Sequence, residues 1–258
     1  MIEEPFRWVE AIANRREYIE HQLASGSPIV ALSYSGGILM LTLSRDRRKI
    51  FEIYDRIAAG VIGHPGDIER LRMAAIEVAS TEGFARSAQD VSLRRMAHYS
   101  LSPMLKNAFE QIYGPPFLAK MLFVELGGNG TPDLFLRLDY DGTIHASHSG
   151  FGSAHETFGV LGPNAHATGA MSRWLRENAP AERDLNAAIQ LALKAWAVGH
   201  LQHADEERMP AQDEISAHIK TQCAESSIEA VVLEHDAPAH LACRTLDKTL
   251  LDEVLKAL

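Results

Sequence analysis

The sequence predicts a single α+β domain built as a four-layer αββα sandwich, with an amphipathic helix at its N-terminus. Three observations predict this fold. The segments expected to form strands come in groups separated by groups of helices, which argues against a doubly wound parallel sheet. Neighbouring strands are joined by short turns typical of antiparallel hairpins. The 258 residues are 46% hydrophobic, which is enough to bury two stacked sheets under covering helices.

The first quarter of the chain predicts one helix and then four strands. Apolar residues recur at helical spacing over residues 5–23, and Ser25-Gly26 ends this helix. Two strongly apolar runs then predict a buried hairpin, and two shorter runs predict a second pair of strands. The four strands are expected over residues 28–34, 37–43, 50–54 and 57–62.

The middle of the chain predicts two helices followed by further strands. Asp67 is expected to cap the first helix, which ends near Gly83. The second helix is expected over residues 91–113, with a bend at Pro103, because proline lacks the amide hydrogen that a helix interior uses. Strands are expected again over 117–126, 133–140 and 143–147, the last two joined by the turn Asp141-Gly142.

The remaining elements complete the sandwich. A strand, two helices, two closing strands and a last helix are expected over residues 157–161, 164–178, 184–203, 228–233, 240–244 and 247–258. Residues 204–225 are polar and are interpreted as an insertion, either loop or loose helix. The single domain therefore divides into an N-terminal region (1–25), a core (26–203), the insertion (204–225) and a closing unit (226–258).

The composition excludes several classes of protein. With 34 acidic and 25 basic side chains, the net charge of −9 disfavours non-specific binding to nucleic acid. Cys223 and Cys243 have no CxxC partner, which argues against a zinc site or a disulfide framework. No apolar run approaches the roughly 20 residues that span a bilayer, and the start MIEEPFRW does not resemble a leader. We expect a soluble cytoplasmic protein that binds neither nucleic acid nor membranes.

Five segments carry a resemblance to one family. They are GSPIVALSYSGGILMLTL at 26–43, KIFEIYDRIAAGVIGH at 49–64, YGPPFLAKML at 113–122, PDLFLRLDYDGT at 132–143 and LNAAIQLALKAW at 185–196. In this order they resemble the proteasome family of the Ntn-hydrolase fold, and its bacterial α-type subunits in particular. Two features depart from the wider family: Pro115 replaces an arginine, and the Tyr-Asp-Arg gating tripeptide of archaeal and eukaryotic α-subunits is absent, as it is in bacterial ones.

The family contains catalytic β-subunits and structural α-subunits, and the residues around Ser27 favour the second class. An N-terminal nucleophile needs its own free α-amino group, which here would require cleavage before Ser27. The resemblance places Leu43 where β-subunits carry a supporting aspartate, and a leucine side chain cannot accept a hydrogen bond. Pro28 also restricts the backbone next to Ser27. We therefore expect no catalytic residue, with two alternatives: a self-processing hydrolase that uses Ser27, or a proteasome-like ring protein outside the 20S particle.

The resemblance implies a role in assembly and gating during protein degradation. Family α-subunits form a homo-heptameric ring, stack on β-type subunits and narrow the entrance for protein substrates that an AAA+ ATPase delivers. The residues that match this gate are Met1, Ile2, Glu3 and Glu4. Lys49 matches the lysine that binds the C-terminal carboxylate of the ATPase tail, and Gly26 and His64 match two further residues of that pocket. Without the resemblance, Lys49 is one more solvated charge in a basic turn.

The histidines and glycines predict no metal or cofactor. Two groups of histidines, at 145, 148 and 155 and at 200 and 203, lie near predicted elements, the second beside acidic residues 205–207. Neither group has a third ligand at a known motif spacing, so we expect structural or solvated histidines. The glycine-rich segment 149–153 matches neither of the common phosphate-binding motifs.

Overall fold

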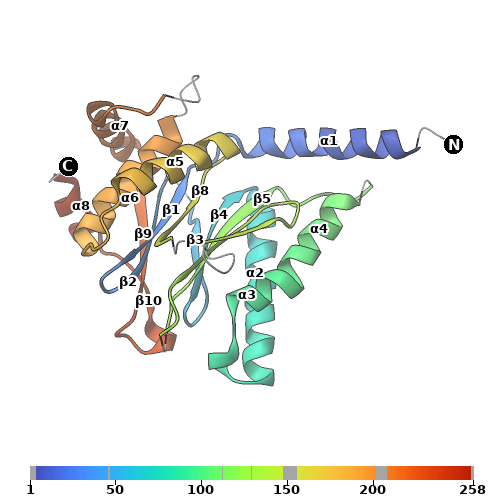
Figure 1. Ribbon diagram of the computed structural model, residues 1–258, viewed down its shortest axis with the longest axis horizontal. Helices are drawn as coiled ribbons and strands as arrows, with labels where there is room; N and C mark the ends of the chain where they lie inside the picture. The colour runs from blue at the N-terminus through green and yellow to red at the C-terminus, as the bar shows by residue number, and fades with distance from the viewer. Residues whose placement is uncertain are drawn as a thin grey trace.

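Two stacked antiparallel sheets covered by helices form the body of the protein in a computed structural model (Figure 1). The structure describes residues 4–45, 47–111, 113–128, 130–147, 156–201 and 208–256, with side chains from Arg7 onward. One five-stranded sheet has the order β10-β9-β2-β1-β8, and the other has the order β3-β4-β5-β6-β7. The predicted αββα sandwich with an N-terminal helix is therefore confirmed.

The first sheet is built on the predicted apolar hairpin. Its strands are β1 (Ile29–Tyr34), β2 (Gly37–Ser44), β8 (Phe158–Leu161), β9 (Ser227–Glu234) and β10 (Cys243–Thr245). In the hairpin, Ile29 pairs with Thr42 and Tyr34 pairs with Gly37. Its outer face is covered by α5 (Ala165–Asn178), α6 (Leu185–Leu201), α7 (Gln212–Glu225) and α8 (Lys248–Lys256).

The second sheet carries the other helices. Its strands are β3 (Ile50–Tyr54), β4 (Ile57–Gly63), β5 (Ala119–Glu125), β6 (Leu134–Leu138) and β7 (Ile144–Ala146). Its outer face packs against α2 (Pro65–Ala85), α3 (Leu93–Met96) and α4 (Ser102–Glu110). The longest uninterrupted helix of this layer, α2, lies alongside β3 and β4.

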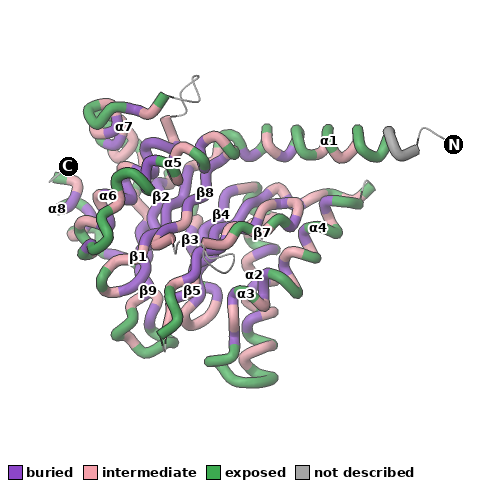
Figure 2. Tube along the Cα trace, in the orientation of Figure 1, coloured by how far each residue is buried: buried purple, intermediate pink, exposed green. Residues whose placement is uncertain are grey.

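Burial on both faces explains the uninterrupted apolar runs in the central strands. On β1, Ile29 and Ala31 face the opposite sheet, where they pack with Ala58 and Leu122. Val30 and Leu32, which alternate with them, pack in the core beneath α5 and α6. Figure 2 shows the consequence: the strands are buried along most of their length, whereas exposed residues lie on the outer sides of the helices.

Helix α1 (Glu4–Leu23) leaves the sandwich and projects from it (Figure 1). Near its C-terminal end, Ile19 and Leu23 are buried in the core between the sheets. Its neighbour Glu20 accepts hydrogen bonds from Lys120 Nζ and Tyr140 Oη, at 3.0 and 2.8 Å. In the middle of the helix, Arg15 donates to the carbonyl oxygens of Ala108 and Phe109 at the end of α4. This half of α1 is therefore fixed to the body.

The predicted cap of α2 is wrong. The helix begins one turn earlier, with His64 as N-cap and Pro65 in its first turn, where proline's missing amide hydrogen costs nothing. Nδ1 of His64 accepts a hydrogen bond from Gly66 N at 3.2 Å. The Asp67 carboxylate instead accepts from Leu118 N at 3.0 Å, so it ties α2 to the segment that enters β5.

The predicted helix over 91–113 is interrupted. After a 3₁₀ turn at Ala88–Asp90, α3 continues into a π-helical turn at Ala97–Leu101 and then into α4. Pro103 stands in the first turn of α4, so the wider turn comes where the proline cannot complete a regular ladder. Residues 212–225, interpreted as loop or loose helix, form the regular helix α7. No helix among the described residues is long and apolar enough to cross a membrane.

Candidate functional site

Lys49 is held in place by its backbone. It lies just before β3, on the segment that crosses from the first sheet to the second. The Glu229 carboxylate of β9 accepts hydrogen bonds from the amides of Lys49 and Ile50, both at 2.9 Å. The carbonyl oxygen of Lys49 accepts from Val61 N, also at 2.9 Å. Hydrogen bonds from β9 in one sheet and β4 in the other therefore fix the backbone position of Lys49.

The ammonium group of Lys49 is partly buried and has no anionic contact within the described part of the chain. Burial lowers its pKa, and the nearby Glu229 carboxylate only partly opposes this shift. Among the described residues, no hydrogen bond or ion pair reaches its Nζ atom. A desolvated ammonium without a counter-ion favours an anionic ligand, because such a ligand would restore the lost solvation.

A hollow beside Lys49, which we call the Lys49 pocket, is formed by four separate segments. They are the turn before β1, the stretch from the end of β2 to Lys49, helix α6, and the end of α7 with the residue after it. The residues that line it are Ser25, Ser27, Leu43, Ser44, Arg45, Arg47, Lys49, Trp196, His200, Gln222 and Ser226. Of the described residues that line it, Arg45, Arg47 and Lys49 are basic and none is acidic. Its chemistry suits a small anionic group such as a carboxylate.

The hydroxyl of Ser27 is engaged in the wall of this pocket. Ser27 Oγ donates to Leu43 O at 2.7 Å and accepts from Trp196 Nε1 at 3.0 Å. The backbone carbonyl of Leu43, the residue that the resemblance aligns with the supporting aspartate of β-subunits, thus accepts the hydrogen bond of the serine. Ser27 also follows a turn in which Gly26 N donates to Leu23 O, directly after the anchored helix α1. In this chain its nitrogen belongs to a peptide bond, so it offers no free amine as a base.

Gly26 and His64 lie around the same strand end as Lys49. A Cβ atom on Gly26 would come within 2.3 Å of Ile62 Cγ2, so close packing against β4 requires a glycine. His64 directly follows β4 and caps α2, as described above. The three sequence-predicted residues therefore surround the end of one strand. Of these three, the pocket lining includes Lys49, while Ser25 and Ser27 line it on either side of Gly26.

Helices α6 and α7 supply an aromatic wall that the sequence analysis missed. Nδ1 of His200 and Nε2 of His218 are 2.8 Å apart and share a hydrogen bond. The Trp196 ring stacks against His200 with a centroid distance of 4.7 Å. Burial, followed by the charges of His218, Lys49 and Arg45, lowers the pKa of His200 to about 4. The spacing of Ile215, His218 and Ile219 is the signal that could have revealed α7 and this contact.

The proposed gate residues are described only in part. Met1, Ile2 and Glu3 lie outside the described residues, and Glu4 begins α1 with a side chain that the structure does not describe. Beyond them, Trp8 and Val9 on the projecting half of α1 are exposed, as is Tyr18 nearer the body.

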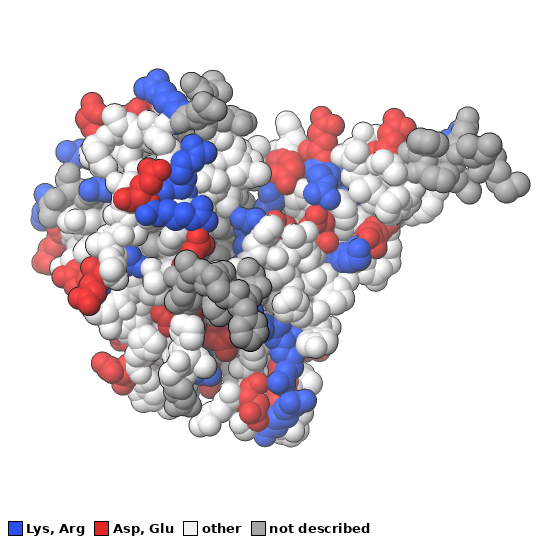
Figure 3. Space-filling view, viewed as in Figure 1, with Lys and Arg blue, Asp and Glu red and all other residues white. Residues whose placement is uncertain are grey.

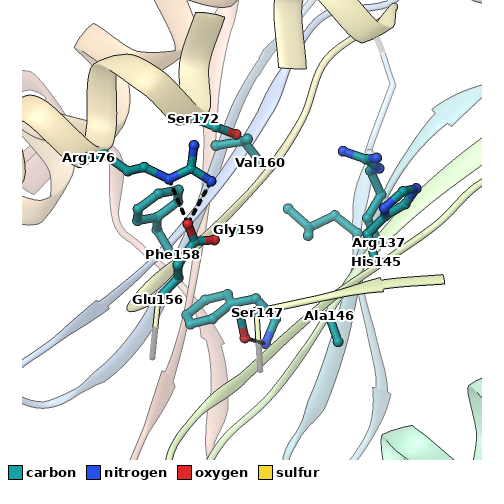
Figure 4. A pocket seen from close by; sticks show the side chains of 12 residues that line it. Arg137, His145, Ala146, Ser147, Glu156, Phe158, Gly159, Val160, Ser172 and Arg176 are labelled. Atoms are coloured by element: carbon teal, nitrogen blue, oxygen red, sulfur yellow. Dashed lines mark hydrogen bonds and ion pairs between the residues drawn. The ribbon is translucent and has the colours of Figure 1, made fainter. Parts of the chain in front are cut away.

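A second hollow lies where β7 and β8 edge the two sheets (Figure 4). Arg176 of α5 pairs with Glu156 at its rim, at 2.7 Å. Arg137 Nε lies 3.4 Å from one carboxylate oxygen of Asp139, and His145 Nε2 lies 3.3 Å from the other. In the described parts of the chain, no group of three potential metal ligands occurs, while His148, His155, His203 and residues 205–207 lie outside them. Acidic and basic side chains are interspersed over the face shown in Figure 3.

Comparison with known proteins adds independent information. The profile of the proteasome subunit family matches residues 23–196. "Proteasome subunit alpha" of Actinosynnema mirum is 29% identical over 252 residues, which cover 96% of this chain and 85% of that protein. The Mycobacterium ulcerans protein of the same name is 27% identical over 253 residues, covering 96% and 84%. That of Nocardioides sp. is 28% identical over 208 residues, covering 79% and 75%. The family match ends at Trp196, so α7 lies beyond it.

Proposed function

The chain belongs to the proteasome subunit family, and from this premise we propose that it is the non-catalytic α-type subunit of a bacterial 20S proteasome. Its relatives named above are all called proteasome subunit alpha. The observation that carries the assignment is the state of Ser27. Its hydroxyl donates a hydrogen bond to Leu43 O, and its amide nitrogen follows a turn directly after a helix that is packed into the body.

The proposal places this chain in the outer rings of the particle. A homo-heptameric α ring would bury the exposed apolar side chains of α1 between neighbouring copies. Phe84 and Tyr99, 96% and 80% exposed on the helices over the second sheet, suit a contact with another subunit, such as a β-type chain. Proteolysis would then belong to the β partner, and the α ring would serve as scaffold for cytoplasmic protein degradation.

Entry and docking complete the proposal. Met1, Ile2, Glu3 and Glu4 would form the gate that protein substrates pass. Lys49 would bind the C-terminal carboxylate of an AAA+ ATPase tail, with Gly26 and His64 shaping the strand end beside it. Two observations support this role: the partly buried Lys49 ammonium has no ion-pair partner among the described residues, and Arg47 and the Glu225-paired Arg45 line the same pocket.

Native mass spectrometry tests the assignment. The full chain would be purified alone, and then after co-expression with the β-type subunit of the same genome. We expect an intact chain near 28.4 kDa that forms sevenfold species, alone or with the β-type chain, with peptidase activity only in the mixed particle.

Two other results would replace this proposal. A chain cut between Gly26 and Ser27 would move the chemistry into this protein, as a self-processing hydrolase. Intact rings that never combine with the β-type chain would instead indicate a proteasome-like assembly outside the 20S particle. Substituting Ser27 with alanine separates these outcomes, because only the self-processing hydrolase would lose peptidase activity with that change.

A further inference from the structure

The wall of the Lys49 pocket contains a pair of histidines that nothing above uses. His200 lines the pocket from α6, and His218 of α7 closes a 2.8 Å hydrogen bond with it from behind. Both rings stack on Trp196, with centroid distances of 4.7 and 6.0 Å. Trp196 in turn donates to Ser27 Oγ at the opposite wall. The pair is therefore a fixed part of the pocket.

Burial favours the neutral form of both histidines, and the positive charges near His200 add to this effect. Lys49 and Arg45, from the segment before β3, both lower the pKa of His200 after the larger effect of burial. Burial also lowers the pKa of His218, against the opposing charge of Glu214 on its own helix. Two nearby carboxylates among the described residues are already engaged: Glu225 pairs with Arg45 at 2.5 Å, and Glu229 accepts hydrogen bonds from the amides of Lys49 and Ile50.

We infer that the Lys49 pocket binds its anion together with a proton, which the His200–His218 pair takes up from solvent. The inference rests on the proposed function, in which a carboxylate occupies this pocket. A carboxylate beside Lys49 and Arg45 offsets the positive charge that disfavours a charged histidine. The neutral pair holds two protons, one in the hydrogen bond between the rings and one on an outer ring nitrogen. The added proton therefore goes to the other outer nitrogen, either His200 Nε2 or His218 Nδ1.

This coupling makes the affinity of the pocket for its anion depend on pH. Because binding and protonation favour each other, the affinity for a carboxylate rises as the pH falls from 7.5 toward 5.5. Neighbouring opposite charges move pKa values by one to three units, so we expect about three- to tenfold tighter binding at pH 5.5. A ligand without a carboxylate lacks the charge that drives proton uptake.

Calorimetry on the full-length chain, in the assembly it forms with its β-type partner, tests the inference. The probe is N-acetyl-trialanine with a free C-terminal carboxylate, titrated at pH 7.5 and 5.5 in two buffers of different ionisation enthalpy. We expect tighter binding at pH 5.5, net proton uptake at intermediate pH, and loss of both when the probe carries a C-terminal amide.

Three variants assign the effect to its residues. In His200→Gln, the ratio of the affinities at the two pH values falls to about one, whereas the exposed His240→Gln, at the far end of β9, retains the wild-type ratio. Lys49→Met loses binding at both pH values. Lys49-dependent binding without proton uptake, or with an unchanged ratio in His200→Gln, would overturn the inference and leave the docking site intact. If the wild-type chain binds no probe at either pH, both proposals fail.

Discussion

At the residue scale, the Lys49 pocket depends on which polar groups are already engaged and which are not. Both carboxylate oxygens of Glu229 accept hydrogen bonds from the backbone amides of Lys49 and Ile50. Glu229 therefore positions the lysine backbone but forms no direct ion pair with its ammonium group. The Ser27 hydroxyl donates a hydrogen bond to the Leu43 carbonyl oxygen and accepts one from Trp196 Nε1. The lysine is therefore available to a ligand, whereas the serine acts as a structural link between β1 and α6.

Replacing Lys49 tests the first of these roles. We expect Lys49→Ala to abolish stimulation of the assembled particle by ATPase tail peptides, because the variant removes the charge that pairs with the tail carboxylate. Ring assembly should be unaffected, since the backbone bonds of residue 49 remain. Peptide hydrolysis with and without tail peptide measures the first effect, and native mass spectrometry measures the second. Lys106→Ala, an exposed cation on α4, is the matched control; unchanged stimulation in Lys49→Ala would remove Lys49 from docking.

Gly26 offers a separate test of packing beside the pocket. In Gly26→Ala the new methyl group meets Ile62 Cγ2 at 2.3 Å, so we expect a loss of about 1–3 kcal/mol in the free energy of unfolding. Urea denaturation measures this loss. Ile62→Ala, which is destabilising by itself, should remove the clash. The double variant should then lose less than the sum of the two single losses, and strict additivity would contradict the packing argument.

Only part of this site could be predicted from the sequence. Lys49, Gly26 and His64 were predicted from the family resemblance, and the structure places all three around one end of β4. Trp196, His200 and His218 were missed as a unit because their contact depends on how α7 folds back over α6. Contacts between distant helices are only weakly visible in the local sequence pattern. Here the one signal is the buried Ile215 and Ile219 on either side of His218.

At the scale of elements, the same limit appears at helix ends and interruptions. Strand pairs and long helices were predictable because apolar periodicity reports burial directly. The choice between neighbouring N-cap residues was not predictable, because His64, Pro65 and Asp67 all favour a helix start. The Asp67 carboxylate accepts a hydrogen bond from Leu118 N instead, and His64 caps the helix. The π-helical turn before Pro103 likewise depends on how α3 and α4 must both pack on the second sheet.

The ion pair between Glu20 and Lys120, which anchors α1 to the body, can be removed by a single substitution. Lys120 is buried, and Glu20 is the carboxylate that pairs with it. We expect Glu20→Ala to lower the free energy of unfolding by roughly 1–3 kcal/mol, because it leaves a buried ammonium without its counter-ion. Hydrogen exchange across α1 should also accelerate. Glu17→Ala, exposed on the same helix, should change neither quantity; equal effects of the two variants would argue against an anchoring role.

The contact between α6 and α7 predicts a pH dependence of stability. His200 has a pKa of about 4 in the folded chain against an ordinary value of 6.5, so between these values the unfolded chain binds more protons. Its contribution is complete above pH 6.5 and is lost as the pH falls toward 4; by pH 5 we expect a loss on the order of 1–2 kcal/mol. Denaturation of the ligand-free chain at pH 7.5 and 5 measures this loss. His200→Gln should show a smaller loss than wild type, and an equal loss would contradict the assignment.

At the scale of the whole molecule, the sandwich buries its own apolar surface well, whereas the projecting half of α1 does not. Trp8 and Val9 on this helix are 46% and 61% exposed. Figure 1 shows the helix extending away from the sheets. The helix is rigidly joined to the body through Glu20 and Arg15, so its apolar side chains project at a fixed angle. A fixed projecting helix suits a repeated contact between identical copies, because every copy presents it in the same direction.

This geometry predicts that the exposed end of α1 controls assembly without controlling the fold. In the double variant Trp8→Asp and Val9→Asp, two carboxylates replace apolar surface that a neighbouring copy would desolvate, so we expect rings to give way to single chains. The free energy of unfolding of the single chain should change by less than about 0.5 kcal/mol, because neither side chain packs in the described core. Native mass spectrometry measures the oligomeric state, and denaturation followed by circular dichroism measures the free energy of unfolding. Glu10→Gln, exposed on the same part of α1, is the control that should keep the ring. Rings that survive the double variant would move the subunit contact away from α1, to surfaces such as the one that bears Phe84 and Tyr99.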